Sequence, residues 1–325
     1  MRSFRFLFIF ILFIPISIVL ALTDRVYIGG ENIGIDVKTN GILVIGLYKI
    51  NNEIINKDSN ISTGDYIIEI NNKKIYKIDD FIREIYDSED KNNINIKLKR
   101  NNELIDTHIN VIYDDNEYKT GLYLKDNISG IGTLSFIDPN NNRFFALGHQ
   151  IEDINTNKII DISSGNIYYS YITSINRSDN GDIGEKNADT DPNQTYGIIN
   201  SNTKSGIFGE YTNNYTSKEL FEVASIDEIK LGSAKIRTVT SGEDVKEYDI
   251  NIDHIDKKDE YKNILFSVTD EELISKTGGI VQGMSGSPII QNNKLIGVIN
   301  YVIVNDCRKG YGIFAINMLK EAEKE

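Results

Sequence analysis

Apolar and polar residues alternate through much of the first third of the chain, which is typical of strands with one buried face. Residues 93–112 read NINIKLKRNNELIDTHINVI and predict a half-buried hairpin. Residues 33–50 read IGIDVKTNGILVIGLYKI and predict two strands, separated by a turn at Lys-Thr-Asn-Gly. Between these regions, residues 65–75 (DYIIEINNKKI) predict two short strands around an Asn-Asn turn.

In one segment of this region, apolar residues recur every three or four positions instead of every two. Residues 78–87 read IDDFIREIYD, with apolar residues at helical spacing. Asp79 and Asp80 stand near its beginning, where the helix dipole favours negative charge. The region therefore predicts a small α+β domain.

From about Gly121 onward, the apolar runs are short and are separated by turns rich in Asn, Gly and Asp. Many short strands of this kind favour a β-barrel or a β-sandwich. The last residues, after Gly312, predict a surface helix. The chain of 325 residues is long enough for two domains with separate cores. The fold is predicted to be mainly β.

The N-terminus has a different pattern. An uncharged run extends from Phe6 to Leu22 after Arg2 and Arg5. Such a run is near the lower limit of about 17 residues for spanning a bilayer, and the preceding charges direct the rest of the chain out of the cytoplasm. We expect a signal or membrane anchor at residues 1–22, cleaved or retained, followed by a linker at 23–30.

Composition narrows the classes of function. The net charge is −13, and no basic face is evident, so nucleic acid is not expected as a partner. The single cysteine, Cys307, excludes an internal disulfide and thiolate metal clusters. Three scattered histidines make a histidine-rich metal site improbable. We expect neither a metal nor a cofactor.

The most specific local signal is Gly-Met-Ser-Gly-Ser-Pro at residues 283–288. Flanking glycines let the backbone turn sharply and leave the Ser285 hydroxyl uncovered. The amides of Gly283 and Ser285 can both face one oxygen, as an oxyanion hole requires. A nucleophilic serine also needs a base, and His149, after the apolar strand RFFALG, is the best-placed histidine.

Residues 31–112 resemble a PDZ domain, on the Gly-Asp-Tyr-Ile-Ile-Glu-Ile-Asn run at residues 64–71 and the helix start Asp-Asp-Phe. PDZ domains bind peptides by strand addition after a short loop. The best match to that loop is Ile33-Gly34-Ile35, which the resemblance implies as peptide-binding residues. The alternative is a small spacer domain that packs on its neighbour.

The segments FFALGHQIEDINT, GEKNADTDPNQTYGI and GGIVQGMSGSPIIQNNKLIGV resemble the SpoIVB peptidase, a sporulation serine peptidase family. The resemblance implies a trypsin-like double β-barrel at residues 113–325, with His149 as general base and Ser285 as nucleophile. Ser287 is the weaker nucleophile candidate. The family's aspartate falls at Asp270. A trypsin-like order would instead favour one of two aspartates in the polar loop, Asp191 or Asp189.

The resemblance also implies a role. The family cleaves itself near its N-terminus and cleaves a membrane-bound regulator, which activates gene expression in the mother cell. The expected location is the space between the two forespore membranes. The expected partners are a protein substrate, the chain's own N-terminal region and the membrane. Two rival functions are an inactive PDZ scaffold and a general envelope quality-control protease.

Overall fold

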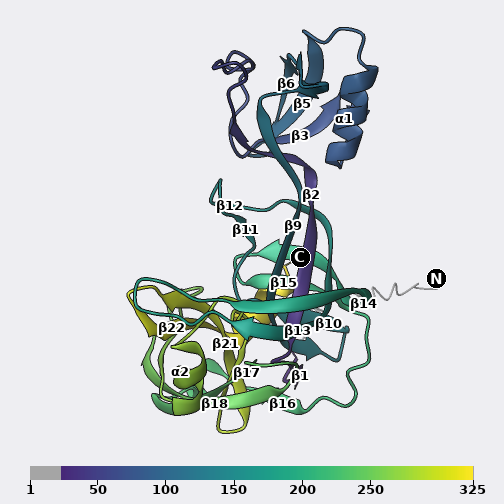
Figure 1. Cartoon of the computed structure of the whole chain (residues 1–325). Coiled ribbons are helices and arrows are strands. Elements are labelled where there is room, and N and C mark those ends of the chain that lie inside the picture. The colour runs from purple at the N-terminus through teal and green to yellow at the C-terminus, as the bar shows by residue number, and fades with distance from the viewer. Residues whose placement is uncertain (1–22, 325) are drawn as a thin grey trace, which may run out of the picture.

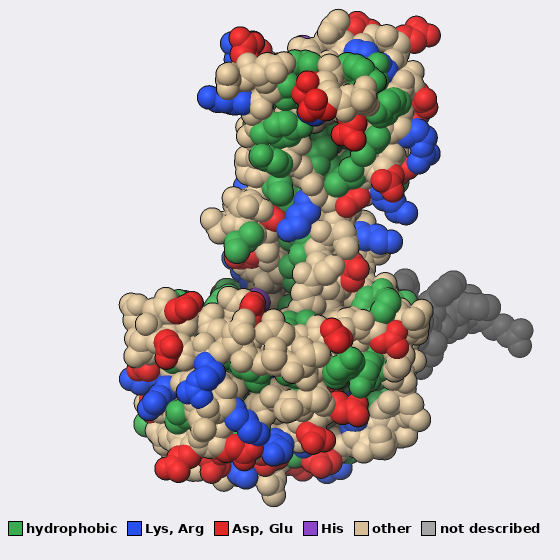
Figure 2. All heavy atoms as spheres, in the orientation of Figure 1, with side chains coloured by type: hydrophobic (Ala, Val, Ile, Leu, Met, Phe, Trp, Pro, Cys, Tyr) green, Lys and Arg blue, Asp and Glu red, His purple; other side chains and the backbone are tan. Residues whose placement is uncertain are grey.

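Two long strands run through a narrow neck and join the two lobes of the molecule. The computed structural model describes residues 23–324, and nearly all of the regular structure is β (Figure 1). β2 (Asn32–Leu47) runs from the wide lower lobe into the small upper lobe, and β9 (Leu122–Asp138) returns from the upper lobe to the lower one. Figure 2 shows the constriction between the lobes.

The lower half of β2 and most of β9 belong to a closed barrel. Each strand pairs antiparallel with the next in the order β9-β2-β13-β14-β15-β10, and β10 pairs with β9 to complete the ring. Its core contains Ile33, Val37, Leu134 and Phe144. The remaining strands of this first barrel are β10 (Arg143–Ala146), β13 (Ile162–Ile175), β14 (Lys186–Thr203) and β15 (Gly206–Tyr211).

A second barrel follows in sequence and repeats this arrangement. Its antiparallel order is β17-β18-β19-β22-β21-β20, and β20 pairs with β17 to close the ring. Tyr248, Phe266 and Ile289 lie in its core. The strands are β17 (Gly232–Val239), β18 (Val245–Ile255), β19 (Ile264–Val268), β20 (Pro288–Gln291), β21 (Lys294–Ile303) and β22 (Asp306–Phe314). The predicted double barrel is confirmed by this pairing.

A third apolar cluster holds the two barrels together. It joins β1 (Arg25–Ile28), both barrels and the C-terminal helix α3 (Ala315–Ala322). β1 pairs with β9 and with β16 (Leu220–Val223), so part of the linker expected at residues 23–30 is a strand of the lower lobe. The expected membrane segment, residues 1–22, lies outside the described residues. No helix within residues 23–324 is long and apolar enough to cross a bilayer.

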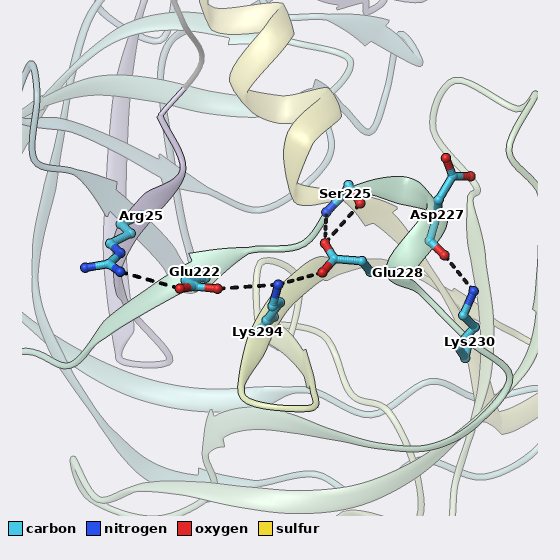
Figure 3. A network of polar contacts seen from close by, with 7 residues as sticks. All are labelled: Arg25, Glu222, Ser225, Asp227, Glu228, Lys230 and Lys294. Carbon is cyan, nitrogen blue, oxygen red and sulfur yellow. Dashed lines mark hydrogen bonds and ion pairs between the residues drawn. The ribbon is translucent and has the colours of Figure 1, made fainter.

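An exposed charge network ties the segment between the barrels to its neighbours (Figure 3). The Lys294 ammonium, at the β20–β21 turn, lies 2.6 Å from Glu228 and 3.4 Å from Glu222. Because these groups are exposed, such pairs contribute little to the free energy of unfolding. Glu228 ends the short 3₁₀ helix η1 (Ile226–Glu228). A further helix of the lower lobe, α2 (Glu271–Thr277), precedes the Gly-Met-Ser-Gly-Ser-Pro segment at residues 283–288.

The small upper lobe is an α+β domain with its own core. Helix α1 (Ile78–Asp87) buries Phe81 and Ile85 against the strands, as its periodicity predicts. The lobe contains the upper half of β2, the beginning of β9, β3 (Tyr66–Ile70), β4 (Lys73–Lys74), β5 (Ile94–Arg100) and β6 (Glu103–Ile109). The small hairpin of β7 (Ile112–Asp114) and β8 (Glu117–Lys119) precedes β9.

The prediction of two strands separated by a turn at residues 38–41 is wrong. The chain continues as the single strand β2, because its lower half is flanked by β13 and β9 and its upper half by β3 and β9. The turn signal becomes an irregularity in the β2–β9 register between Lys38 and Leu43, where Gly41 has a φ of +105°. The bend lies where the chain passes from one lobe to the other.

A small apolar joint connects the lobes at this bend. Leu43 and Tyr66 of the upper lobe pack with Ile160, and Ile128 and Ile151 of the lower lobe pack against them. Ile151 and Ile160 flank a two-stranded hairpin, β11 (Glu152–Asp153) and β12 (Lys158–Ile159). The small lobe therefore contacts the segment that directly follows His149 in sequence.

Candidate active site

The serine loop, residues 283–288, connects α2 to β20 in a conformation that needs both glycines. Gly283 and Gly286 have φ values of +91° and +92°, which favour glycine. A Cβ at Gly286 would lie 2.3 Å from the Thr133 carbonyl oxygen and 2.5 Å from the Leu147 amide nitrogen. Gly286 therefore lets the second barrel approach the first directly beside Ser285.

Thr133 of β9 holds this loop from the first barrel. Its hydroxyl donates to the Gly283 carbonyl at 2.8 Å, and its amide donates to the Ser285 carbonyl at 3.0 Å. The Thr133 side chain is fully buried, so both bonds are shielded from water. They fix the Gly283–Met284 and Ser285–Gly286 peptide groups.

Two amides of the loop stay available for a ligand. The Met284 amide donates to the Val281 carbonyl at 3.1 Å and the Ser287 amide to the Met284 carbonyl at 3.0 Å, and the Gly286 amide donates to the Ile299 carbonyl at 2.7 Å. Within residues 23–324 the amides of Gly283 and Ser285 have no acceptor. This pair is the predicted oxyanion hole, and its donors are free to bind a developing negative oxygen.

Burial distinguishes the two serines of the loop. Ser285 is partly exposed and lines a cavity, whereas Ser287 is fully buried. The Ser287 hydroxyl lies 3.5 Å from the Thr133 hydroxyl. A substrate carbonyl can reach Ser285 and not Ser287, so the geometry favours Ser285 as nucleophile.

His149 follows β10 after two residues in the left-handed region. Leu147 and Gly148 have φ values of +70° and +69°. Leucine rarely adopts this conformation, which costs free energy on the order of 1–3 kcal/mol, and such strain gathers at functional sites. The ring of His149 stacks on Tyr301 of β21 with centroids 5.6 Å apart. Strain in the first barrel and stacking on the second together orient the imidazole.

A backbone hydrogen bond sets the tautomer of His149. Its Nδ1 lies 2.8 Å from the Gln150 carbonyl oxygen. A carbonyl can only accept, so Nδ1 carries the proton and the lone pair remains on Nε2. Burial lowers the pKa of His149, while the Gln150 carbonyl and the Glu152 carboxylate act in the opposite direction. The imidazole is therefore neutral at neutral pH and can accept a proton from a hydroxyl.

One cavity contains both predicted residues. It has a volume of about 310 Å³ and is lined by His149, Ser285 and Gly283. The first barrel supplies the histidine and the second supplies the serine, 136 positions later in the sequence. The fold thus brings together the base, the nucleophile and an oxyanion donor that were predicted from separate segments.

Asp270 lies elsewhere in this structure, as the N-cap of α2. One carboxylate oxygen accepts from the Leu273 amide at 2.9 Å and the other from the Asp249 amide at 3.3 Å. This is the common capping role of aspartate. Its place in a catalytic triad stays a prediction from the family resemblance, and the structure does not bring it to His149.

The two alternative aspartates are also engaged away from the histidine. Asp189 accepts from the Tyr171 hydroxyl at 3.0 Å, and Asp191 accepts from the Asn193 amide at 2.9 Å. Among residues 23–324 no carboxylate hydrogen-bonds to the His149 ring. The Gln150 carbonyl takes the position that a triad aspartate would occupy. The sequence could not single out this group, because every residue has a backbone carbonyl.

The peptide-binding assignment of Ile33-Gly34-Ile35 needs correction. These residues lie in the lower half of β2, where β13 pairs along one edge and β9 along the other. Ile33 and Ile35 are buried in the first barrel. Strand addition needs a free edge, so a peptide cannot pair here.

Sequence reasoning also missed Lys186, which lies beneath the serine loop. Its aliphatic carbons are 3.1–3.3 Å from the position of a Cβ at Gly283, and its ammonium donates to the Thr238 hydroxyl at 3.0 Å. No carboxylate pairs with it among the described residues, and burial lowers its pKa to about 7. Lysine in a polar stretch gave no signal of burial. No three His, Cys, Asp or Glu side chains in residues 23–324 gather as a metal site would require.

Solved structures with partial likeness include two forms of a protease from M. tuberculosis. The inactive form of Rv3671c protease is 12% identical, with a TM-score of 0.34 over 60% of this chain and 83% of that one. Its active form is 12% identical, with a TM-score of 0.35 over 61% and 74%. Human heparin binding protein is 10% identical, with a TM-score of 0.31 over 59% and 84%. No curated protein matches the chain.

The family comparison covers most of the chain. A PDZ domain model matches residues 32–111, which include the small lobe, and a SpoIVB peptidase S55 model matches residues 116–319. The second match spans more than half of the chain and includes the serine loop, His149, the second barrel and every strand of the first barrel except β2. The chain belongs to the SpoIVB peptidase S55 family of serine peptidases.

Proposed function

We propose that this chain is an endopeptidase in sporulation signalling, with Ser285 as nucleophile and His149 as general base. The observation that carries the catalytic part is the pair of unpartnered amides at Gly283 and Ser285, in a loop that shares its cavity with His149. The Ser285 hydroxyl attacks the scissile carbonyl, and Nε2 of His149 takes its proton. The carbonyl oxygen becomes negative and is bound by the two amides.

The second half of the reaction uses the same groups. His149 gives its proton to the leaving amine, which departs and leaves an acyl-serine. Water then attacks the acyl group and His149 accepts a proton from this water. The bond to the Ser285 oxygen breaks, His149 returns the proton to that oxygen, and the acid product is released. Burial favours the neutral imidazole between these steps.

Family membership and the small lobe support the choice of substrate. A PDZ domain followed by a peptidase indicates a protein substrate that is held while it is cut. We propose that the chain cleaves a membrane-associated regulator outside the cytoplasm, in the space between the two forespore membranes, and also cleaves its own N-terminal region. Residues 1–22 would direct it there.

An inactive scaffold is the less favoured alternative. A scaffold would have no use for two free amides around an uncovered serine, or for a left-handed leucine before the histidine. Such strain persists only where the surrounding structure maintains it. Its presence next to His149 favours an active enzyme.

The test compares the purified full-length wild type with Ser285→Ala and Ser287→Ala. Each protein is incubated alone and with a peptide library, and the products are identified by mass spectrometry. We expect cleavage by wild type and by Ser287→Ala, and loss of at least about 10³-fold of the rate in Ser285→Ala. If folded Ser285→Ala cleaves as fast as wild type, the assignment is wrong.

A further inference from the structure

The cavity beside the catalytic pair is apolar on one side. Its walls include five aliphatic side chains, contributed by β2, by β9 and by the segment around His149: Ile35, Ile128, Ile131, Leu147 and Ile151. Ile35 and Leu147 are 6% and 5% exposed, so they form its floor. The first barrel contributes all of these residues, and the second barrel contributes the serine loop.

The polar groups of the cavity are those of the reaction and of its mouth. His149, Gly283 and Ser285 line it together with Gln150, Glu152 and Gln282. The Glu152 carboxylate is exposed and accepts from the Gln150 side chain. An acidic substrate side chain would meet a like charge there and an apolar floor below, and both are unfavourable.

The volume suits a single side chain. About 310 Å³ is near the lower end of ligand pockets, which begin at roughly 300 Å³. Because the same cavity contains the nucleophile and an oxyanion donor, the scissile carbonyl must lie at its edge. The part of a substrate that can enter is therefore a side chain next to the bond being cut.

We propose that this cavity binds one large apolar side chain, such as leucine, methionine or phenylalanine, from a substrate residue that flanks the scissile bond. The proposal rests on the proposed function and adds its substrate class. Pockets of this kind discriminate by about 10–200-fold in kcat/KM for one methylene. Leucine in place of alanine adds more than one methylene, so a preference within or above this range is expected.

Gly130 offers a way to fill the cavity without disturbing the fold. It lies in β9, opposite Ile35 of β2, and lines the cavity. A Cβ built at Gly130 meets no atom within 4 Å. A leucine at this position would therefore occupy cavity space, whereas Asn127, three residues earlier and exposed on the same strand, lies outside the cavity.

The experiment uses the full-length chain and a peptide whose cleavage site has been identified by mass spectrometry. Variants of that peptide carry Leu, Ala, Asp or Lys at each residue flanking the bond, and kcat/KM is measured for each. At one of the two positions we expect Leu to exceed Ala by at least about 10-fold and to exceed Asp by more. In Gly130→Leu the Leu-to-Ala ratio should fall to about one or below, while Asn127→Leu keeps the wild-type ratio.

Three results would overturn the proposal: no preference for an apolar residue at either position, a preference for Lys directed by Glu152, or an unchanged ratio in Gly130→Leu. A wild type that cleaves nothing would instead overturn the proposed function. Binding of fluorescent alanine-based peptides that carry a single Leu, Ala, Asp or Lys to the Ser285→Ala chain, measured by fluorescence anisotropy, then tests the cavity alone. Tighter binding of the Leu peptide than of the Asp peptide supports the proposal, and equal binding overturns it.

Discussion

The serine side and the histidine side of the active site are built in different ways. On the serine side, Thr133 fixes two carbonyls of the loop and only the functional amides are left free. On the histidine side, the ring depends on its neighbour's carbonyl, on stacking against Tyr301 and on a strained Leu147. The proposed nucleophile and oxyanion hole are preorganised by hydrogen bonds between barrels, whereas the proposed base is oriented by local backbone conformation and packing.

The difference explains how this site can lack a carboxylate beside the histidine. An aspartate usually holds the imidazole in the correct tautomer and stabilises the imidazolium that forms. The Gln150 carbonyl performs the first task here, since it requires the proton to be on Nδ1. For the second, the one carboxylate within residues 23–324 that acts on the pKa of His149 is the exposed Glu152. The pKa of the base therefore depends on its burial and on the Glu152 charge, and not on a buried carboxylate partner.

The two sides meet at Gly286, and a methyl group there should have the largest effect. In Gly286→Ala the new Cβ would overlap the Thr133 carbonyl and the Leu147 backbone, at a φ that alanine rarely adopts. The barrels must separate or the loop must turn, and a displacement of about 1 Å at a reacting centre can cost about 100-fold in rate. We expect kcat/KM for a peptide substrate to fall by at least that factor.

A matched glycine serves as control. In the small lobe, a Cβ at Gly46 meets only the Tyr123 ring, at 3.4 Å. Gly46→Ala should keep its activity and its thermal unfolding midpoint close to wild type. Wild-type kcat/KM in Gly286→Ala would show that the barrels do not meet closely at this point.

A feature of the fold or the site could be predicted from the sequence when a short stretch of consecutive residues encodes it. The serine loop is encoded within six consecutive residues, 283–288, so that Ser285 and the amides of Gly283 and Ser285 could be singled out from the sequence as the candidate nucleophile and oxyanion hole. His149 could be chosen because few histidines exist and one follows an apolar strand. β2 could not be predicted, because its Lys-Thr-Asn-Gly turn signal is overridden by pairing with β9 and β13, which come 75 or more residues later.

The group that orients the His149 ring could not be predicted from the sequence. A triad aspartate is a side chain and can be sought in a sequence, but the Gln150 carbonyl is backbone and leaves no trace there. Asp270 stands in Thr-Asp-Glu-Glu, directly before the first apolar residue of a short helix, which is also the pattern of an N-cap. Thr133 and Lys186 were missed for a related reason, since their roles depend on contacts across the barrel interface.

Replacing Lys186 should test how the serine side tolerates a buried cation. Burial lowers the pKa of Lys186 to about 7 from an ordinary 10.5. Between these pH values the unfolded chain binds a proton that the folded chain does not, so this group makes stability rise with pH. Lys186→Met keeps the aliphatic contact with the serine loop and removes the charge. At pH 7 we expect it to raise the free energy of unfolding by a few kcal/mol.

The matched control is Lys294→Met, in the exposed network of Figure 3, where no such gain is expected. Urea denaturation at several pH values between 6 and 10 measures the difference between wild type and Lys186→Met. The difference should be largest at pH 7 and below and should shrink toward pH 10. A difference that is independent of pH would mean that burial does not lower the pKa of Lys186.

The smallest effect concerns the pH dependence of the histidine side. Burial lowers the pKa of His149. We therefore expect kcat/KM to rise with pH, with an apparent pKa below the ordinary histidine value of 6.5, and to stay level at neutral pH. The Glu152 carboxylate favours the imidazolium and so raises this pKa. Glu152→Gln removes that charge, and the acid limb of the profile should move to still lower pH. Glu152→Asp, which keeps the charge, should stay closer to wild type.

A shift of the Glu152→Gln limb to higher pH would contradict this account, and would imply that another carboxylate reaches His149 during turnover. That result would make the two sides of the site more alike than the structure shows, because the base would then also be held by a partner distant in sequence.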